Sequence, residues 1–298
     1  MLDVSIVIVS YNTKDLLKEC LKSIFRETSG VRYEVVVVDN CSSDGSVAMV
    51  RDEFPDVIVV EAGGNLGFGR ANNLGMKSAS GKYLFLLNSD TIVQNNAVGA
   101  FYEKAECLRV NGHKVGVLGS ILLGKDSKPC HSYGRFITPR RELREVLAKY
   151  IRSLKDPENT RPPFVSDMKS VDYVTGADMF VSREAYLDTD GFDPDFFMYC
   201  EEVDWQKRMH AAGYGRYVVE GPRIMHLEGG SDSGEKKLWS PQRLANLYKS
   251  RQIYRKKHYN KLILPFFSAL RLLLDLPSIL LISCMSRRKE YLRLIKLK

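Results

Sequence analysis

Short runs of β-branched and bulky apolar residues alternate with amphipathic helical patterns over the first ninety residues. The apolar runs cover Val4 to Val9, Tyr33 to Val38, Val57 to Val60 and Tyr83 to Leu87, and apolar residues recur at helical spacing from Leu16 to Phe25. This alternation predicts an α/β fold, a mainly parallel sheet flanked by helices on both faces. Right-handed crossovers would then place the carboxyl ends of the strands on one edge.

Polar residues follow these runs at the point where each strand is expected to end. Ser10-Tyr11-Asn12 follows the first run, Asp39 the second, and Asn88-Ser89-Asp90 the fourth. In an open α/β sheet, ligands bind just past the carboxyl ends of the strands. A carboxylate such as Asp90 can hold a divalent cation, and the cation can hold a diphosphate. A turn that uses Asn, Ser and Asp for its own backbone bonds explains the same residues equally well.

The neighbouring polar groups are also open to two interpretations. Asp39 can accept a hydrogen bond from a pyrimidine imide or cap the helix that follows, and Tyr11 can stack on a base or pack at an edge. The glycine-rich loop from Gly63 to Gly69 is not a dinucleotide fingerprint, because its spacing is not GxGxxG and it follows the third run. Such a loop allows close backbone approach to a ligand or forms a structural turn. Polar groups near the following helix start would favour an anion there: Asn65, Arg70, Asn72 and Asn73.

A second acidic cluster contains Glu201, Glu202 and Asp204. If a helix begins here, Glu201 and Asp204 share one face, and Glu202 points elsewhere and can act as a general base. The same residues could instead complement the positive end of the helix dipole. His226 is a candidate ligand for a metal ion or a phosphate, although a lone histidine is more often a structural group.

The chain of 298 residues is expected to hold one large domain and a tail. We assign residues 1–250 to the domain, with a ligand-binding half at 1–110 and a second half at 111–250. Residues 124–169 are expected to form an irregular insert that acts as a lid, because their centre combines proline and charge without apolar periodicity. Residues 251–298 form the expected helical tail.

The tail carries the basic character of the chain. From Lys249 to Lys298 there are thirteen Lys and Arg residues and two acidic residues, so the rest is mildly acidic although the whole chain carries +8. Its apolar stretches, Leu262 to Leu270 and Leu276 to Met285, are too short to span a bilayer. We expect an amphipathic segment lying at an anionic membrane surface, with packing on the body or self-association into a homo-oligomer as alternatives.

Two further features bear on the compartment. The six cysteines form no CxxC pair, which favours a reducing environment without structural zinc. The chain also starts directly with a strand-like run, without the basic and apolar regions of a signal peptide. We therefore expect a cytoplasmic protein, peripheral at the inner face of the cell membrane.

In their order along the chain, these blocks resemble the inverting family 2 glycosyltransferases with a GT-A fold, most of all a rhamnosyltransferase-like branch of bacterial surface polysaccharide synthesis. The resemblance covers about residues 3 to 231. It rests on Val4 to Asn12, Val35 to Gly45, Asn65 to Asn73, Leu86 to Thr91, Gly176-Ala177, Gly191 to Asp193, Phe196 to Tyr199, Glu201 to Asp204, and His226.

The resemblance implies a role for each matching residue. Asp90 would be the metal-binding carboxylate, with His226 helping to hold Mn²⁺ or Mg²⁺ and the diphosphate. Glu202 would be the catalytic base, with Glu201 as the alternative, because the family has Glu-Asp where this chain has two glutamates. Asp39 would bind the nucleobase. The remaining nucleotide-sugar pocket would be lined by Ser10, Tyr11, Asn12, Asn65, Gly67, Phe68, Arg70, Asn72 and Asn88, with the acceptor near Gly176, Ala177 and Asp178.

The implied activity is metal-dependent, inverting transfer of a sugar, with rhamnose favoured. The donor would be a dTDP- or UDP-linked sugar and the acceptor a hydroxyl of a growing, lipid-linked glycan. A nucleotide-sugar sensor without catalytic activity is the first alternative, and it would need no base at Glu202. A nucleic-acid-binding protein is the second, but the leucine content of the tail fits lipid or self-association better, so no nucleic-acid partner is expected.

Overall fold

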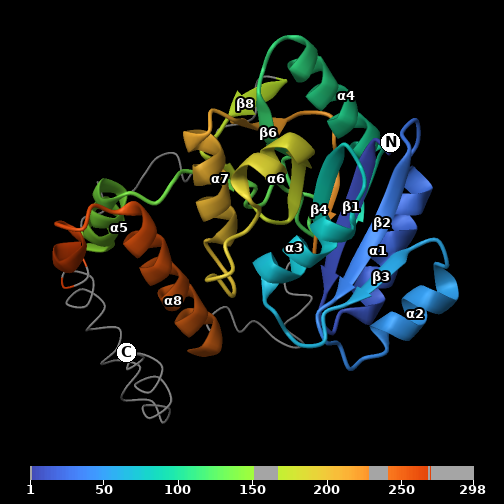
Figure 1. Ribbon diagram of the computed structural model, residues 1–298, viewed down its shortest axis with the longest axis horizontal. Coiled ribbons are helices and arrows are strands. Elements are labelled where there is room, and N and C mark those ends of the chain that lie inside the picture. The colour runs from blue at the N-terminus through green and yellow to red at the C-terminus, as the bar shows by residue number, and fades with distance from the viewer. Residues whose placement is uncertain (1, 151–166, 228–240, 268, 270–298) are drawn as a thin grey trace. The chain divides into compact units, whose positions relative to one another are not determined.

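The structure, a computed structural model, describes residues 2–150, 167–227, 241–267 and 269 (Figure 1). The chain divides into two compact units. The first contains Met1–Phe136 and Ser166–Glu235, and the second contains Ile137–Val165 and Lys236–Lys298. Each unit is described by itself below.

An eight-stranded sheet forms the centre of the first unit, in the order β3-β2-β1-β4-β10-β6-β11-β8. Its first four members are mutually parallel, and each begins at or within one residue of the run expected from the sequence. The burial patterns of β1 and β4 show little alternation because both of their faces are covered, whereas the edge strand β3 is partly exposed. These strands are β1 (Val4–Ser10), β2 (Tyr33–Asp39), β3 (Ile58–Glu61) and β4 (Tyr83–Asn88).

The other half of the sheet is mixed. Strand β10 (Asp178–Ser182) runs antiparallel to β4 and to β6 (Val115–Gly119). Strand β11 (Gly215–Val219) is parallel to β6, and β8 (Met168–Ser170) is antiparallel to β11. This architecture confirms the expected α/β class with a mixed, mainly parallel sheet.

Two small sheets lie beside the central one. Strand β5 (Thr91–Val93) pairs antiparallel with β12 (Ile224–His226), so a segment late in the sequence is held against the residues that follow β4. Strand β7 (Tyr133–Gly134) pairs with β9 (Tyr173–Val174). The β5–β12 pair therefore places His226 opposite Thr91, next to the end of β4.

Helices cover the sheet through their apolar faces. Leu17, Cys20, Leu21 and Ile24 of α1 (Lys14–Glu27) are buried in the core cluster. The other helices of this unit are α2 (Ser46–Glu53), α3 (Phe68–Ser78), α4 (Ala97–Val110), α6 (Arg183–Thr189) and α7 (Glu201–Ala211).

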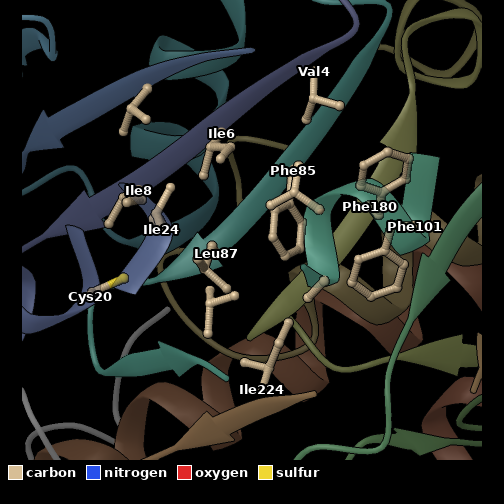
Figure 2. Close-up of a cluster of buried hydrophobic side chains, with 14 of the residues drawn as sticks. Val4, Ile6, Ile8, Cys20, Ile24, Phe85, Leu87, Phe101, Phe180 and Ile224 are labelled. Atoms are coloured by element: carbon tan, nitrogen blue, oxygen red, sulfur yellow. The ribbon is translucent and has the colours of Figure 1, made fainter. Parts of the chain in front are cut away.

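The core is centred on aromatic side chains that join three elements (Figure 2). The rings of Phe101 in α4 and Phe180 in β10 stack with their centroids 5.3 Å apart, and Phe85 of β4 lies 5.4 Å from Phe101. On the opposite face of the sheet, α3 approaches so closely that a Cβ on Gly75 would lie 2.4 Å from Val7. This contact needs glycine because a methyl group would overlap the strand.

The second unit contains α5 (Pro139–Tyr150) and α8 (Pro241–His258). Helix α5 lies inside the segment 124–169, so the expectation of an irregular insert is wrong for this part. Helix α8 runs across residue 250, where we expected the tail to begin. Residues 151–166 of the expected lid and 270–298 of the expected tail lie outside the described residues. Within the described part of the chain, no helix combines the length and apolarity needed to cross a bilayer.

Candidate active site

Three polar strand ends lie side by side at one edge of the sheet. Strand register pairs Ser10 with Asp39, and Val9 with Asn88. The carboxyl ends of β2, β1 and β4 therefore meet, as expected for parallel neighbours. This edge collects the residues that the sequence singled out after the first, second and fourth apolar runs.

One carboxylate oxygen of Asp39 accepts a hydrogen bond, and the other has no partner among the described residues. Its Oδ2 accepts a hydrogen bond from the Ser42 backbone N–H at 3.0 Å, which holds the turn after β2. Its Oδ1 is buried and makes no hydrogen bond to any residue that the structure describes. A buried carboxylate oxygen without a donor is costly to keep, so this atom is suited to accept a hydrogen bond from a ligand.

The loop after β1 is tied both to the Asn88-Ser89-Asp90 turn and to the loop after β2. The buried hydroxyls of Ser10, Thr13 and Ser89 form a chain with oxygen–oxygen distances of 3.0 Å at both links. Asn12 has a φ of 53° and accepts a hydrogen bond from the Ser43 backbone N–H at 2.8 Å. Tyr11 stays 39% exposed, which leaves its ring accessible.

The glycine-rich loop is anchored on both sides. Asn65 Oδ1 accepts hydrogen bonds from Asn40 Nδ2 at 3.1 Å and from the Gly67 N–H at 3.0 Å. Gly67 has a φ of 82°, and a Cβ there would lie 2.1 Å from the Phe197 carbonyl oxygen. The Phe68 N–H donates to that same oxygen at 3.0 Å. The loop thus requires glycine at position 67 to meet the segment that precedes α7.

Two further residues expected in the nucleotide-sugar pocket make protein contacts. Arg70 Nε donates to the Pro194 carbonyl at 2.6 Å. Asn72 is 2% exposed, and its Nδ2 donates to the Phe68 carbonyl at 3.0 Å. Both side chains therefore help to shape the start of α3 and the loop against it.

Asp90 and His226 form a close pair beside the end of β4. His226 Nε2 lies 3.2 Å from Asp90 Oδ1, and Asn88 Nδ2 lies 3.5 Å from the same ring nitrogen. The Leu227 N–H donates to the Asp90 carbonyl at 2.9 Å, which fixes the two backbones together. Each side chain is mostly buried, with 13% of Asp90 and 16% of His226 exposed.

The pair fits a divalent cation. Two donors that each lie about 2.1 Å from one ion and meet at a right angle are about 3 Å apart. An oxygen and an imidazole nitrogen are both ligands for Mn²⁺-type ions. In the part of the chain that the structure describes, no group of three or more His, Cys, Asp or Glu side chains could hold a metal ion.

The acidic cluster lies at the start of α7, as the sequence predicted. Tyr199 and Cys200 have φ values of 71° and 65°, a conformation that is costly for residues with a side chain and that is often kept at functional sites. Asp204 is buried and pairs with Arg208 at 2.9 Å. Asp204 is therefore a structural residue, which leaves the two glutamates for chemistry.

Burial changes the acidity of both glutamates. Glu201 is 4% exposed and its Oε2 makes no hydrogen bond to a described residue. Burial raises the pKa of Glu201 well above its usual range, and the neighbouring charge of Glu202 adds to the effect. Burial also raises the pKa of Glu202, which is half-buried. A carboxylate with a raised pKa is a stronger base once it is ionised.

The residues that the sequence predicted to bind the acceptor make contacts within the protein. A Cβ on Gly176 would lie 3.1 Å from the Phe68 ring, and the Ala177 carbonyl accepts from the Asn88 N–H at 3.0 Å. Asp178 is fully buried, and its Oδ2 accepts from the Ser120 N–H at 2.7 Å and from the Ser120 hydroxyl at 2.6 Å. Burial raises the pKa of Asp178 to about 7. A side chain without solvent exposure does not reach an acceptor directly.

The sequence analysis did not predict several residues that form this edge of the sheet. Thr13 and Ser89 complete the buried hydroxyl chain, and Phe197 supplies the carbonyl that the glycine loop needs. Ser89 and Phe197 lie inside quoted motifs, so they could have been included. Ser120 follows an ordinary apolar strand, and nothing in its sequence neighbourhood distinguishes it.

The comparisons with known proteins identify the family of the chain. The model of the family described as "Glycosyl transferase family 2" matches residues 5–155. Rhamnosyltransferase WbbL of Escherichia coli K12 is 24% identical over 231 residues, which cover 75% of this chain and 83% of that protein. The N-acetylglucosaminyl-diphospho-decaprenol L-rhamnosyltransferase of Mycobacterium tuberculosis H37Rv is 25% identical over 241 residues, which cover 74% and 75% of the two chains.

Solved structures share the fold. TarS of S. aureus matches 96% of this chain with a TM-score of 0.57 and 15% identity. GalNAc-T7, crystallised with UDP, GalNAc and Mn²⁺, matches 77% with a TM-score of 0.56 and 17% identity. The matched part spans 44% and 45% of those two longer chains. The matched family model covers half of this chain, and with these neighbours it shows that the chain belongs to glycosyl transferase family 2 and is a glycosyltransferase with a GT-A fold.

Proposed function

We propose that this glycosyltransferase moves a sugar from a nucleoside-diphosphate donor to a hydroxyl of a growing glycan in bacterial surface polysaccharide synthesis, with inversion at the anomeric carbon. Rhamnose is the favoured sugar, because two relatives that match about three quarters of the chain carry that activity in their names. The observation that carries the proposal is the 3.2 Å separation of Asp90 Oδ1 and His226 Nε2 at the sheet edge that also holds Asp39.

The donor would bind along the carboxyl ends of β2, β1 and β4. Asp39 Oδ1 would accept the imide N–H of a uracil or thymine base, since it is buried and unpartnered among the described residues. Tyr11 would lie against the base, and the Asn65–Phe68 loop would approach the ribose. Asp90 and His226, helped by Asn88, would hold Mn²⁺ or Mg²⁺ together with the diphosphate. When bound, the cation would neutralise charge on the departing diphosphate.

Glu202 would act on the acceptor. Ionised Glu202 would remove the proton from the attacking hydroxyl, and attack from the face opposite the diphosphate would invert the anomeric configuration. Glu201 lies beside Glu202, and burial together with the charge of Glu202 raises the pKa of Glu201 well above its usual range, which favours Glu202 as the ionised base. Gly176 and Ala177, which contact Phe68 and Asn88, would border the acceptor side.

A donor screen tests the reaction. The purified protein is incubated with dTDP-rhamnose and with UDP-linked sugars, with Mn²⁺ or Mg²⁺, with and without a polyprenyl-diphosphate-linked acceptor, and release of nucleoside diphosphate is measured. We expect release that depends on metal and acceptor, together with a glycosylated product. A protein that binds donor but neither hydrolyses nor transfers it would be the non-catalytic sensor. The alternative is disfavoured here because a sensor has no use for two adjacent glutamates whose pKa values are raised by burial.

The composition of the second unit supports contact with a membrane that holds a lipid-linked acceptor. Its described residues include eleven Lys and Arg and two Glu. One of these glutamates, Glu142, is buried and neutralised by a bidentate pair with Arg255 at 2.7 and 2.9 Å. Leu262 and Phe266, at 87% and 62% exposure, lie close to Lys256, Lys257 and Lys261 in sequence. Exposed apolar side chains among cations fit an anionic lipid surface.

Vesicle binding tests this contact. Leu262→Ser with Phe266→Ser should reduce sedimentation with phosphatidylglycerol vesicles, and neutral phosphatidylcholine vesicles should bind poorly. Leu187→Ser is the matched control, because Leu187 is 68% exposed in the first unit beside Asp188 and Asp190. Equal binding by both variants would exclude this surface. A loss of dimer in analytical ultracentrifugation without a loss of vesicle binding would instead identify self-association.

A further inference from the structure

Asp178 is a fully buried carboxylate that holds the point at which the chain leaves the sheet after β6. Strand β6 ends at Gly119, and both the N–H and the hydroxyl of the next residue, Ser120, donate to Asp178 Oδ2. Two short hydrogen bonds to one carboxylate oxygen fix the position of Ser120 firmly. Asp178 thus determines the direction of the segment that begins there.

That segment is hydrogen-bonded to β12, the strand on which His226 lies. The Leu123 N–H donates to the Ile224 carbonyl at 2.9 Å, and the His226 N–H donates to the Leu123 carbonyl at 2.7 Å. Only two residues separate Ser120 from Leu123, so a shift at one end moves the other. The backbone of His226 is therefore positioned through a short segment whose origin is held by Asp178.

Further contacts link His226 to Asp90 and link the Asn88–Asp90 turn to the start of β10. The Leu227 N–H donates to the Asp90 carbonyl, and the His226 ring contacts the Asp90 carboxylate. The Asn88 N–H, two residues earlier, donates to the carbonyl of Ala177, the residue before Asp178. The start of β10 therefore contacts the Asn88–Asp90 turn directly and reaches His226 through the Ser120–Leu123 segment.

A second observation separates Asp178 from an ordinary structural residue. Its Oδ1 is buried and makes no hydrogen bond to any of the residues described. The charges of Asp178 and His226 also interact with each other. A buried oxygen without a donor costs free energy of folding, so the two hydrogen bonds that the other oxygen accepts from Ser120 are kept at a cost.

We propose that Asp178 is a positioning residue, which through Ser120 and Leu123 sets the His226 imidazole against Asp90. The inference rests on the proposed role of Asp90 and His226 as the cation-binding pair. It replaces the direct acceptor contact expected for Asp178 from the sequence. No atom of Asp178 touches donor or acceptor in this role, and its effect is to hold the pair at the spacing that a cation requires.

Imidazole NMR provides a direct test. The ring signals of His226 are assigned in histidine-labelled protein by their loss in His226→Gln. Asp178→Ala should shift these signals, and it should weaken Mn²⁺ binding, measured by electron paramagnetic resonance with nucleoside diphosphate present, by roughly 10–100-fold. Asp178→Asn keeps a carbonyl oxygen for Ser120 and should restore most of both properties.

Ser182→Ala is the matched control. Ser182 lies at the other end of β10, is buried, and joins that strand to β6 through a hydrogen bond to the Val115 carbonyl at 2.6 Å. It should lower the melting temperature as Asp178→Ala does but leave the His226 signals in place. Unchanged His226 signals in Asp178→Ala, or an equal shift in Ser182→Ala, would overturn the proposal.

The test also gives an answer if Asp178→Ala does not fold or if the wild-type protein binds no Mn²⁺. If Asp178→Ala does not fold, Ser120→Ala removes one of the two hydrogen bonds and should move the His226 signals by a smaller amount, and no movement would refute the positioning role. If the wild-type protein binds no Mn²⁺, the proposed metal function fails, while the NMR comparison still decides whether Asp178 positions His226.

Discussion

His226 Nε2 lies 3.2 Å from Asp90 Oδ1, although His226 ends β12 and Asp90 lies in the turn between β4 and β5, far away in the sequence. The antiparallel β5–β12 pair brings them together, and the Leu227–Asp90 backbone hydrogen bond holds the register. A strand pair is a stiff support, so the spacing of the two side chains is set by the fold rather than by a ligand. This preorganisation is the property that a cation site needs.

Replacement of either member of the pair should abolish most activity. We expect Asp90→Asn and His226→Gln each to lower kcat/KM for donor turnover by about 100-fold or more, because transition-state charge would lose its stabilisation. His210→Gln is a suitable control, since His210 lies in the last turn of α7. Initial rates across a Mn²⁺ series measure the effect, and wild-type rates in either variant would contradict the assignment.

Single substitutions distinguish the roles of Glu201 and Glu202. Glu202→Gln should reduce kcat by about 10²–10⁴-fold while donor binding, measured by calorimetry, stays within a few-fold of wild type. Glu201→Gln should reduce kcat less, because Glu201 does not take the proton of the acceptor in this assignment. A larger loss in Glu201→Gln than in Glu202→Gln would exchange the two roles.

The pH dependence follows from the raised pKa of Glu202. Burial disfavours its ionised form, so the fraction of enzyme with a competent base rises with pH through a value above the ordinary 4.5. We expect kcat/KM to increase on this acidic limb and the limb to keep its place in Glu201→Gln, since burial rather than the charge of Glu201 raises the pKa of Glu202. A limb that starts at or below the ordinary glutamate value would argue against a buried base.

Asp39 should contribute to donor affinity rather than to the chemical step. Asp39→Ala should raise KM for the nucleotide sugar by about 10-fold, because a hydrogen bond to a charged acceptor contributes about 1.5–3 kcal/mol. The value of kcat should change little. Calorimetric titration with UDP or dTDP provides the same comparison without turnover, and unchanged nucleotide affinity would remove Asp39 from the pocket.

Gly67 tests the close approach of the glycine loop to Phe197. Gly67→Ala adds a methyl group 2.1 Å from a carbonyl oxygen at a φ of 82°, so both overlap and backbone strain apply. Gly63→Ala is the matched control, because Gly63 has a φ of 70° and no atom lies within 4 Å of its added Cβ. We expect a loss of about 1–2 kcal/mol for Gly63→Ala and a clearly larger loss for Gly67→Ala, measured by urea unfolding.

Much of the fold follows from local pattern. The apolar runs predicted β1 to β4 with small errors at their ends, because continuous β-branched and bulky apolar residues are typical of strands in a parallel sheet. The register of parallel neighbours then brought Ser10, Asp39 and Asn88 to one edge. The sequence was less informative for residues 124–169, where helix α5 lies in a segment rich in charged residues.

The sequence by itself determined the sheet, the carboxyl edge and the residue types gathered there, because strand periodicity and parallel crossovers are local and topological properties. Only the tertiary structure decided that Asp90 lies against His226, that Asp204 is engaged by Arg208, and that Asp178 is buried behind the site. Those facts depend on pairings between distant segments. A single sequence records which groups are present, but it does not record which long-range hydrogen bonds satisfy them.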